Sequence, residues 1–271
     1  MENILKIDSL QNPRVKTAAK LRKGKVRKET GCTLVEGYRE ILRATESDWK
    51  FIELYYCPEL YLDSEASNLV SKIRNGGIPA FLCSEAAFRK MSYRDTPDGL
   101  MALSPLVGKS LDELALPANP LLLIAENLEK PGNLGTILRT ADATGVDAVI
   151  VPRHGAAGLG PTVSKVAAGA AEQLSFAPVA NIGRVLAWFA DYGIRCIGTS
   201  DKADSSLFEA DLSGSVALVM GREHTGLSKG IASRCDTLVS LPMQGVVSSL
   251  NVSVATGICL YEIVRQRTRP N

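Results

Sequence analysis

Residues 241–255 place small polar side chains in an otherwise apolar stretch. The segment reads Leu-Pro-Met-Gln-Gly-Val-Val-Ser-Ser-Leu-Asn-Val-Ser-Val-Ala, which predicts a strand end, a loop at Gly245 and then a helix. We expect Ser248 or Ser249 to cap that helix, because a hydroxyl accepts from the free amides of a first turn. Buried polar groups need partners. The stretch is therefore either a capped core helix or the wall of a ligand pocket.

A second candidate segment begins at Asn133 and reads Asn-Leu-Gly-Thr-Ile-Leu-Arg. Asn133 is predicted to cap a helix whose first amides face outward as an anion site. Gly135 and Arg139 are four residues apart and share a helix face, where the glycine permits close approach of a ligand. A bidentate arginine suits a phosphate. For this segment alone, an ordinary capped helix with a surface arginine is the simpler interpretation.

A third candidate segment is Gly-Arg-Glu-His-Thr-Gly-Leu at 221–227. Gly221 and Gly226 flank the carboxylate of Glu223 directly after an apolar run, and glycine permits tight turns. A plain strand-to-loop turn explains the same pattern. His224 has no evident orienting partner, so we interpret it as a turn residue and not as a general base.

The three candidate segments must be positioned by strands, and the sequence contains apolar runs that are typical of buried parallel strands. The runs lie at 121–125, 148–151, 195–198, 216–220 and 237–241, with helical patterns at 134–144, 162–171 and 184–192. This alternation predicts an α/β domain with a mostly parallel sheet. Ligands of such sheets bind at the carboxyl ends of the strands. That rule selects three strand exits, which are Thr199-Ser200, Gly221 and Leu241-Pro242-Met243.

Residues 1–106 predict a smaller α/β unit, joined by a linker at 107–119 to the second domain at 120–271. A basic cluster without acidic residues lies on a predicted helix at 15–21 and a predicted loop at 23–30. Its members are Arg14, Lys16, Lys20, Arg22, Lys23, Lys25, Arg27 and Lys28. Such a cluster fits contact with the phosphates of a nucleic acid, with a solvated helix face as the alternative.

The composition restricts the class of protein. The 271 residues are 45% hydrophobic and 22% charged, the net charge is +2, and no apolar run approaches the ~20 residues of a membrane span. The first residues lack a signal-peptide pattern, and six scattered cysteines without a CxxC pair indicate reduced thiols, so we expect a cytoplasmic protein. With two histidines, we expect neither a metal site nor a histidine-based triad.

Nucleotide-binding motifs are missing from the sequence. It contains no GxxxxGK[ST] pattern, and the glycine-rich stretch at 155–160 lacks GxGxxG spacing. The first strand of the second domain is followed by Ala-Glu-Asn-Leu-Glu-Lys in place of the dinucleotide fingerprint. A nicotinamide-dependent dehydrogenase is therefore excluded as the main interpretation.

Taken in order, the three segments resemble the SpoU (TrmH) family of RNA ribose 2′-O-methyltransferases, of the SPOUT class. The family motifs are N-x-G-x-x-x-R, G-x-E-x-x-G and I-P-M-x-G-x-x-x-S-L-N-V-S-x-A. All three occur here, with Leu241 in place of isoleucine, and Ala168 stands where many members carry serine. The resemblance is firm over 120–268. Residues 1–106 look like the ribosomal-protein-like domain that often binds the RNA substrate in this family.

The resemblance implies an α/β fold in which the C-terminal SPOUT-type parallel sheet carries a deep trefoil knot. It also implies a homodimer through the C-terminal domain and S-adenosylmethionine as the cofactor. By position, the cofactor would contact Thr199, Ser200, Gly221, Leu241, Met243 and Leu250. The implied catalytic residues are Asn133, Arg139, Glu223, Ser249 and Asn251.

The implied reaction is methyl transfer to a ribose 2′-hydroxyl, in which Arg139 has the leading role. Because a guanidinium stays protonated near neutrality, we expect Arg139 to hold a phosphate and stabilise the alkoxide, with Glu223 orienting it. Another group would take the proton. The ribosomal-like unit and the basic cluster favour large-subunit (23S) ribosomal RNA. The alternatives are a transfer RNA substrate and, in a different class, a catalytically inactive RNA-binding protein.

Overall fold

The computed structural model describes residues 5–47, 49–106, 108, 110–153, 157–222 and 225–268. By internal contacts the chain forms two compact units. The first consists of residues 1–107 and 159–173, and the second of residues 108–158 and 174–271. The segment 159–173 thus packs with the first unit, although the strands before and after it belong to the second.

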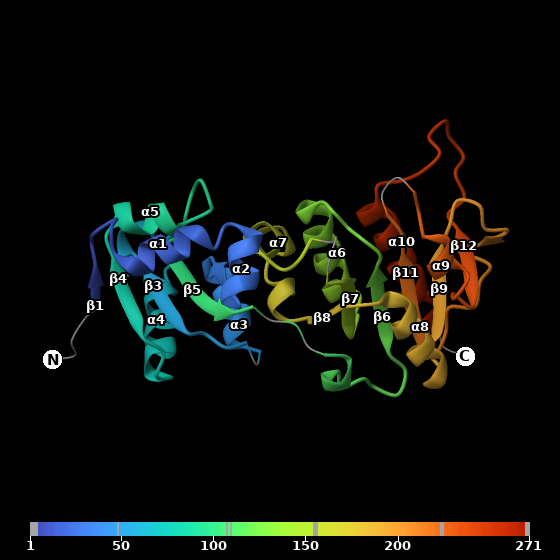
Figure 1. Cartoon of the computed structure of the whole chain (residues 1–271), viewed down its shortest axis with the longest axis horizontal. Helices are drawn as coiled ribbons and strands as arrows, with labels where there is room; N and C mark the ends of the chain where they lie inside the picture. Colours follow the sequence, from blue (N-terminus) through green and yellow to red (C-terminus); the bar gives the residue numbers. More distant parts are fainter. Residues whose placement is uncertain are drawn as a thin grey trace. The chain divides into compact units, whose positions relative to one another are not determined.

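The first unit is built on a five-stranded sheet (Figure 1). Its strands are β1 (Leu5–Ile7), β2 (Cys32–Glu36), β3 (Glu53–Tyr56), β4 (Ala80–Cys83) and β5 (Leu100–Pro105). Its helices are α1 (Pro13–Lys20), α2 (Gly24–Thr30), α3 (Tyr38–Thr45), α4 (Ala66–Asn75), α5 (Glu85–Met91) and α7 (Pro161–Ala167), with 3-10 turns η1 (Pro58–Leu60) and η3 (Ala170–Glu172). The strand order is β1-β4-β3-β5-β2, and β5 runs antiparallel to both neighbours.

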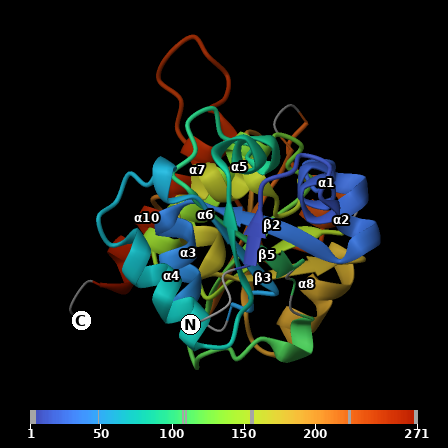
Figure 2. The same ribbon diagram turned by 90° about the vertical axis from the view of Figure 1, so that its left-hand side faces the viewer.

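Both faces of this sheet are covered by helices. Side chains alternate along β3, so Tyr55 joins the apolar cluster beneath α1 and α5, whereas Leu54 and Tyr56 join the cluster beneath α3 and α4. Figure 2 shows α1 and α3 on opposite sides of the strands. The predicted small α/β unit is therefore a sheet buried between two helical layers.

The predicted loop at 23–30 is wrong, because α2 occupies Gly24–Thr30. Lysine, arginine and glutamate are good helix formers, and a basic charge pattern alone does not specify a loop. Lys25 lies 3.8 Å from Glu29 one turn later, and Val26 packs against the core beneath α1. The helix ends at Gly31, whose φ of 63° is the left-handed conformation that glycine adopts without strain.

The second unit contains a seven-stranded sheet. Its strands are β6 (Leu121–Ala125), β7 (Ala148–Pro152), β8 (Ser175–Val179), β9 (Arg195–Thr199), β10 (Ser205–Ser206), β11 (Val216–Met220) and β12 (Thr237–Ser240). Its helices are α6 (Pro131–Ala143), α8 (Ile182–Asp191), α9 (Lys229–Ala232) and α10 (Val252–Arg267), with the 3-10 turn η2 (Leu111–Glu113). The order is β10-β12-β9-β11-β6-β7-β8, and all of these pairs are parallel. The predicted α/β class with a parallel sheet is confirmed.

Both edge strands of this sheet, β8 and the two-residue β10, were missed in the sequence. β8 contains Pro178, which argues against a central strand because proline cannot donate to the ladder. The structure places β8 at the end of the sheet, next to β7 alone, where a proline is tolerated.

Helices cover both faces of the second sheet as well. On one face, α8 packs over the core through Ile182, Val185 and Phe189, joined by Leu111 and Leu114 from the predicted linker. Elsewhere in the unit, α10 packs against α6 and β11. That arrangement sets two helices side by side, each of which follows a strand of the sheet.

In the first unit, Glu172 of η3 is a buried carboxyl group, 2% exposed. Burial raises its pKa to about 7, and the nearby Glu40 adds to the shift. The Ser164 hydroxyl and the Arg94 guanidinium oppose it. The folded chain therefore holds this proton to a higher pH than the unfolded chain, in which the ordinary value of 4.5 applies.

We expect the first unit to lose stability as the pH rises from 4.5 to about 7. Between pH 4.5 and 7 the folded state binds more protons than the unfolded state, so the free energy of unfolding falls by roughly 3 kcal/mol. Glu172→Gln should remove this slope, whereas Glu29→Gln on exposed α2 should retain it. Urea unfolding followed by Trp49 fluorescence in a Trp188→Phe background isolates the first unit. Equal pH slopes in wild type and Glu172→Gln would contradict the prediction.

Candidate active site

Three neighbouring strands, β12, β9 and β11, end at one edge of the second sheet. Val239 of β12 lies opposite Thr199 of β9, and the Ser200 N–H donates to the Val239 carbonyl at 2.9 Å. Since the strands are parallel and in register, Thr199-Ser200, Gly221 and Leu241 leave the sheet side by side. The three strand exits that the sequence singled out are therefore neighbours at one edge of the sheet.

The turn after β11 needs glycine at two positions. Arg222 and Gly226 exchange backbone hydrogen bonds of 3.0 and 3.2 Å. A Cβ atom on Gly221 would lie 2.3 Å from backbone atoms of Gly226 and Leu227, and Gly226 itself has a φ of 64°. The second motif therefore makes a close backbone turn at the strand exit. Its carboxylate, Glu223, lies outside the described residues.

Glu126 positions this turn and was not singled out in the sequence. It follows β6 directly, is 7% exposed, and accepts from the Ser228 N–H at 2.9 Å. Its own N–H donates to the Met220 carbonyl at 2.8 Å. Glu126 thus ties the turn after β11 to the exit of β6. The sequence feature that could have identified Glu126 is its position as an acidic residue directly after the apolar run of β6.

The loop from 241 to 250 presents unpaired backbone groups. None of its N–H or C=O groups bonds to the backbone of another described residue. Leu241 and Met243 are half-buried, whereas Ser249 and Leu250 are exposed. The loop projects from the sheet edge between β12 and α10 (Figure 1). Because backbone polar groups seek partners, this loop can offer donors and acceptors to a ligand beside two apolar side chains.

Both predicted helix caps are wrong. α10 is capped by Asn251, whose side chain accepts from the Ser253 N–H at 2.8 Å, so Ser248 and Ser249 remain in the loop. α6 begins at Pro131, and Asn133 lies inside its first turn. Proline is favoured at a first helical position because its missing N–H costs nothing there.

α6 and α10 bring the first and third motifs together. Asn251 Nδ2 donates to Asn133 Oδ1 at 3.4 Å, and one to two turns further on a Cβ on Gly257 would lie 3.7 Å from Thr140. The two helices therefore start at the same end and run in the same direction. Their first-turn amides make this end favourable for anions.

Arg139 lies on α6, six residues or about 9 Å along the axis beyond Asn133. Its side chain is exposed and forms no hydrogen bond or ion pair within the part of the chain that the structure describes. The guanidinium is therefore free to bind a phosphate or to stabilise a negative charge.

In the predicted basic cluster of the first unit, the arginines stabilise the fold. Arg14 Nε donates to Glu53 at 3.1 Å, and its guanidinium lies 4.4 Å from the centre of the Phe81 ring. Arg22 donates to the carbonyls of Lys90 and Ser92. Arg27 is partly buried, which lowers its pKa, and donates to backbone carbonyls next to α1.

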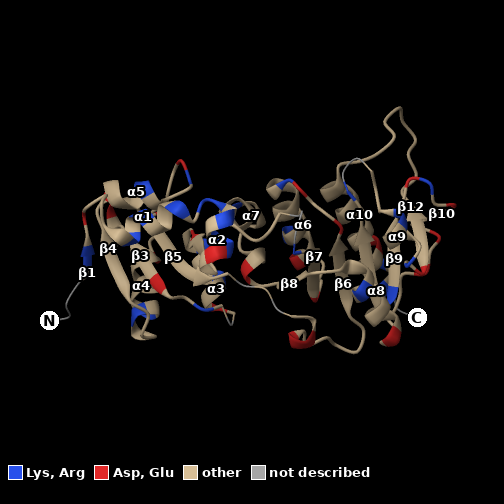
Figure 3. Cartoon of the chain, viewed as in Figure 1, with Lys and Arg blue, Asp and Glu red and all other residues tan. Residues whose placement is uncertain are grey.

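The five lysines of the cluster are exposed and, unlike the arginines, make few contacts with the rest of the unit. Lys25 pairs weakly with Glu29, while four others make no ion pair with a described residue. These four are Lys16, Lys20, Lys23 and Lys28. Figure 3 shows the basic residues of α1 and α2. Freely rotating ammonium groups suit contacts with a phosphate backbone that carry no sequence information.

The pattern of the SpoU rRNA Methylase family matches residues 120–261. The chain belongs to this family. Residues 12–102 match a second pattern, the MRM3-like substrate binding domain. Within this SpoU protein, the matched region contains the strand exits, the whole of α6 and the part of α10 up to Tyr261.

Individual relatives match over nearly the whole length. The 23S rRNA (guanosine-2′-O-)-methyltransferase RlmB of Ralstonia nicotianae is 37% identical over 239 residues, which are 87% of this chain and 96% of the relative. A solved RNA 2′-O ribose methyltransferase is 35% identical with a TM-score of 0.79, covering 97% of this chain and 99% of that one. The SpoU methyltransferase AviRb from Streptomyces viridochromogenes, solved with AdoMet, is 28% identical with a TM-score of 0.87, covering 96% and 100%.

Among the residues that the structure describes, none of the helices has both the length and the apolar character that a membrane span requires. The same residues contain no group of three or more His, Cys, Asp or Glu side chains placed to hold a metal ion.

Proposed function

We propose that this protein transfers a methyl group from S-adenosylmethionine to the ribose 2′-hydroxyl of a guanosine in large-subunit ribosomal RNA. The observation that carries the proposal is the meeting of Asn133 and Asn251, from two SpoU motifs, beside three adjacent strand exits. The choice of RNA and nucleotide is supported by the activity for which the RlmB relative is named, a protein that matches over 96% of its own length.

The strand exits fit the chemistry of this cofactor. S-adenosylmethionine has an apolar adenine face and many hydrogen-bonding groups, and when bound it supplies a methyl group on a positively charged sulfur. The 241–250 loop offers the half-buried Leu241 and Met243 together with backbone groups that bond to no other described backbone group. We assign cofactor binding to Thr199, Ser200, Gly221, Leu241, Met243 and Leu250.

Arg139 is assigned the main catalytic role. A guanidinium group carries a positive charge, so Arg139 would bind the phosphate beside the target nucleotide and stabilise the developing alkoxide. Asn133 and Asn251 would fix the ribose and the cofactor loop relative to Arg139, with Ser249 close to the sugar. Glu223 is proposed to orient Arg139 and lies outside the described residues. Positioning of the reactants would then supply much of the acceleration.

RNA binding is assigned to the first unit. The match of residues 12–102 to a substrate-binding domain and the exposed lysines of α1 and α2 support this role. We retain 1–106 as the RNA-binding domain, 107–119 as the linker and 120–271 as the methyltransferase domain. Modification of ribosomal RNA would take place in the cytoplasm.

A trefoil knot is proposed for the C-terminal part. β12 lies between β9 and β10, although the connection from β9 through β10 to β11 precedes it in the chain. The later segment from Leu241 onward then packs as α10 on α6 and β11. These contacts support threading of α10 through the 200–214 connection, an exception to the usual absence of knots.

A homodimer through the C-terminal domain is proposed as well. α10 carries Val254 and Tyr261, which are 51% and 56% exposed and seven residues apart on one helix face. Leu250, the last residue of the loop before the Asn251 cap, is 36% exposed. A second copy covering this apolar stripe would remove it from water.

The test is methylation of defined RNAs by the purified protein. With S-adenosylmethionine, a 23S rRNA transcript should gain one 2′-O-methylguanosine, while 16S rRNA and transfer RNA transcripts should gain none. Mapping of ribose methylation identifies the nucleotide. Methylation of transfer RNA alone would contradict the proposed substrate and support the transfer RNA alternative. Cofactor binding without methylation of any RNA would support the inactive RNA-binding alternative.

A further inference from the structure

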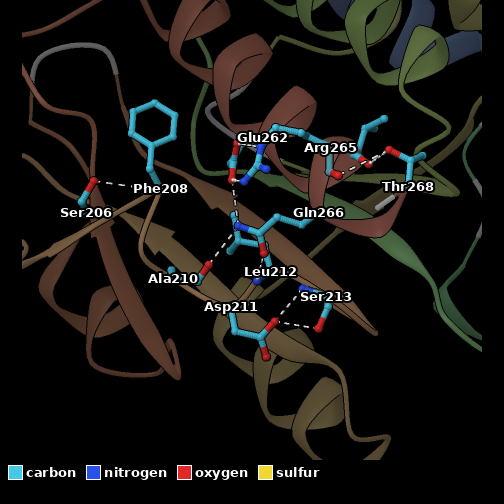
Figure 4. A network of polar contacts seen from close by, with 11 residues as sticks. Ser206, Phe208, Ala210, Asp211, Leu212, Ser213, Glu262, Arg265, Gln266 and Thr268 are labelled. Atoms are coloured by element: carbon cyan, nitrogen blue, oxygen red, sulfur yellow. Dashed lines mark hydrogen bonds and ion pairs between the residues drawn. The ribbon is translucent and has the colours of Figure 1, made fainter. Parts of the chain in front are cut away.

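The last turn of α10 is joined to the 200–214 connection by one side-chain amide. Gln266 Nε2 donates to the Ala210 carbonyl at 3.0 Å, and the Leu212 N–H donates to Gln266 Oε1 at 2.8 Å (Figure 4). The same nitrogen donates to Glu262 Oε1 at 2.8 Å. Both N–H groups and the oxygen of the amide are therefore used, and two of the three bonds reach a segment more than fifty residues away.

Glu262 fixes the orientation of this amide. An ionised carboxylate only accepts hydrogen bonds, so the amide nitrogen must face it. The Glu262 side chain is 6% exposed, and Arg265 donates to both of its oxygens at 2.7 and 2.6 Å. A bidentate pair of this kind is geometrically specific. Gln266 thus presents its donor to Ala210 and its acceptor to Leu212 in a defined arrangement.

The other part of the same connection lies along the end of β12. Ser205 and Ser206 pair with Val239 and Ser240, and the Leu207 N–H donates to the Ser240 carbonyl at 2.8 Å. The side chain of Leu207 is 0% exposed, as is that of Leu212. The connection is therefore held against β12 at 205–207 and against α10 at 210–212.

We infer that Gln266 is a positioning residue for cofactor binding. It holds the 205–212 segment against the end of β12 and thereby fixes the first residues of the 241–250 loop. Leu241 follows Ser240 directly, and Ser200 precedes the held segment on the same connection. Without the amide, Ala210 and Leu212 lose their partners, and the segment is free to move away from the strand exits. The inference rests on the proposed cofactor site.

Gln266→Ala should weaken S-adenosylmethionine binding about tenfold, because the hydrogen bonds to Ala210 and Leu212 that position the connection are lost. The KM for the cofactor should rise in parallel, while the kcat at saturating cofactor and the RNA affinity should stay near wild type. Thr268→Ala is the matched control, because its hydroxyl donates to the α10 carbonyls of Val264 and Arg265 and, among the described residues, to no other group. Calorimetry and steady-state kinetics provide these values.

Gln266→Glu adds a readout that depends on protonation. At neutral pH the new carboxylate cannot donate to Ala210 and repels Glu262, so cofactor affinity should fall at least as much as in Gln266→Ala. Protonation of one carboxyl at lower pH restores a donor. The affinity of Gln266→Glu for the cofactor should therefore recover toward the wild-type value as the pH falls. The ratio of the dissociation constants of Gln266→Ala and wild type should not change with pH.

Hydrogen exchange of the unaltered protein tests the same link if Gln266→Ala does not fold. S-adenosylmethionine should slow exchange at the amides of Leu207 and Leu212, and unchanged exchange there would overturn the inference. A folded Gln266→Ala protein with a wild-type dissociation constant would overturn it as well. A wild-type protein that fails to bind the cofactor would instead contradict the proposed function.

Discussion

Arg139→Ala should lower the kcat for methyl transfer by about 10²–10³, the usual effect of removing a group that stabilises an oxyanion. The side chain is exposed and pairs with no described residue, so its removal should leave the folded structure unchanged. S-adenosylmethionine binding should stay within about twofold, since Arg139 is assigned to the RNA side of the site. Single-turnover methylation of 23S rRNA at saturating cofactor isolates the chemical step.

One further variant separates the effect of charge from that of geometry, and another serves as a control. Arg139→Lys keeps a cation but loses the planar fork, so it should recover only part of the rate. Arg184→Ala removes an exposed arginine from α8, which covers the face of the sheet assigned no catalytic role, and should leave the rate unchanged. A near-wild-type kcat for Arg139→Ala would exclude this residue from catalysis.

Gly221→Ala should weaken S-adenosylmethionine binding by about 10–100-fold, corresponding to the ~1–3 kcal/mol cost of overpacking. The added Cβ would lie 2.3 Å from the backbone of Gly226 and Leu227. Backbone atoms cannot rotate away as a side chain end can, so the turn after β11 must move from its strand exit. Calorimetry on the folded variant, with circular dichroism to establish folding, measures the effect.

Gly230→Ala is the control for this substitution. A Cβ on Gly230 meets no atom within 4 Å, and the residue lies in exposed α9. It should bind the cofactor as wild type does and gain slightly in stability, because alanine favours a helix more than glycine. Wild-type affinity in Gly221→Ala would show that the turn does not shape the cofactor site.

The basic cluster illustrates a difference that residue type alone does not reveal. In the sequence its eight members cannot be distinguished, because all are cationic and no acidic residue lies among them. In the structure Arg14 and Arg22 have partners from β3 and from the end of α5 onward, which are distant in the chain. Which cations remain available to RNA therefore depended on tertiary contacts.

Local features were predictable because they depend on neighbours in the chain. A buried parallel strand has an apolar run, and a turn with close backbone contact requires glycine, so the strand exits and the Gly221–Gly226 turn were identifiable. The motif residue types and their order also sufficed to indicate the SpoU family. Helix starts were harder to predict than strands, because Lys130, Pro131 and Asn133 each suit a position in the first turn. The structure shows that α6 begins at Pro131.

The sequence by itself determined the five internal strands of the second sheet, the parallel α/β class and the three motifs that carry the chemistry. Only the tertiary structure decided that β12 lies beside β9, that Asn251 meets Asn133 across 118 residues, and that Glu126 and Gln266 tie distant turns together. The physical reason is that strand order depends on backbone hydrogen bonds, which every residue except proline offers in the same way. Side-chain patterns therefore encode which residues are buried, while long-range packing decides which buried elements become neighbours.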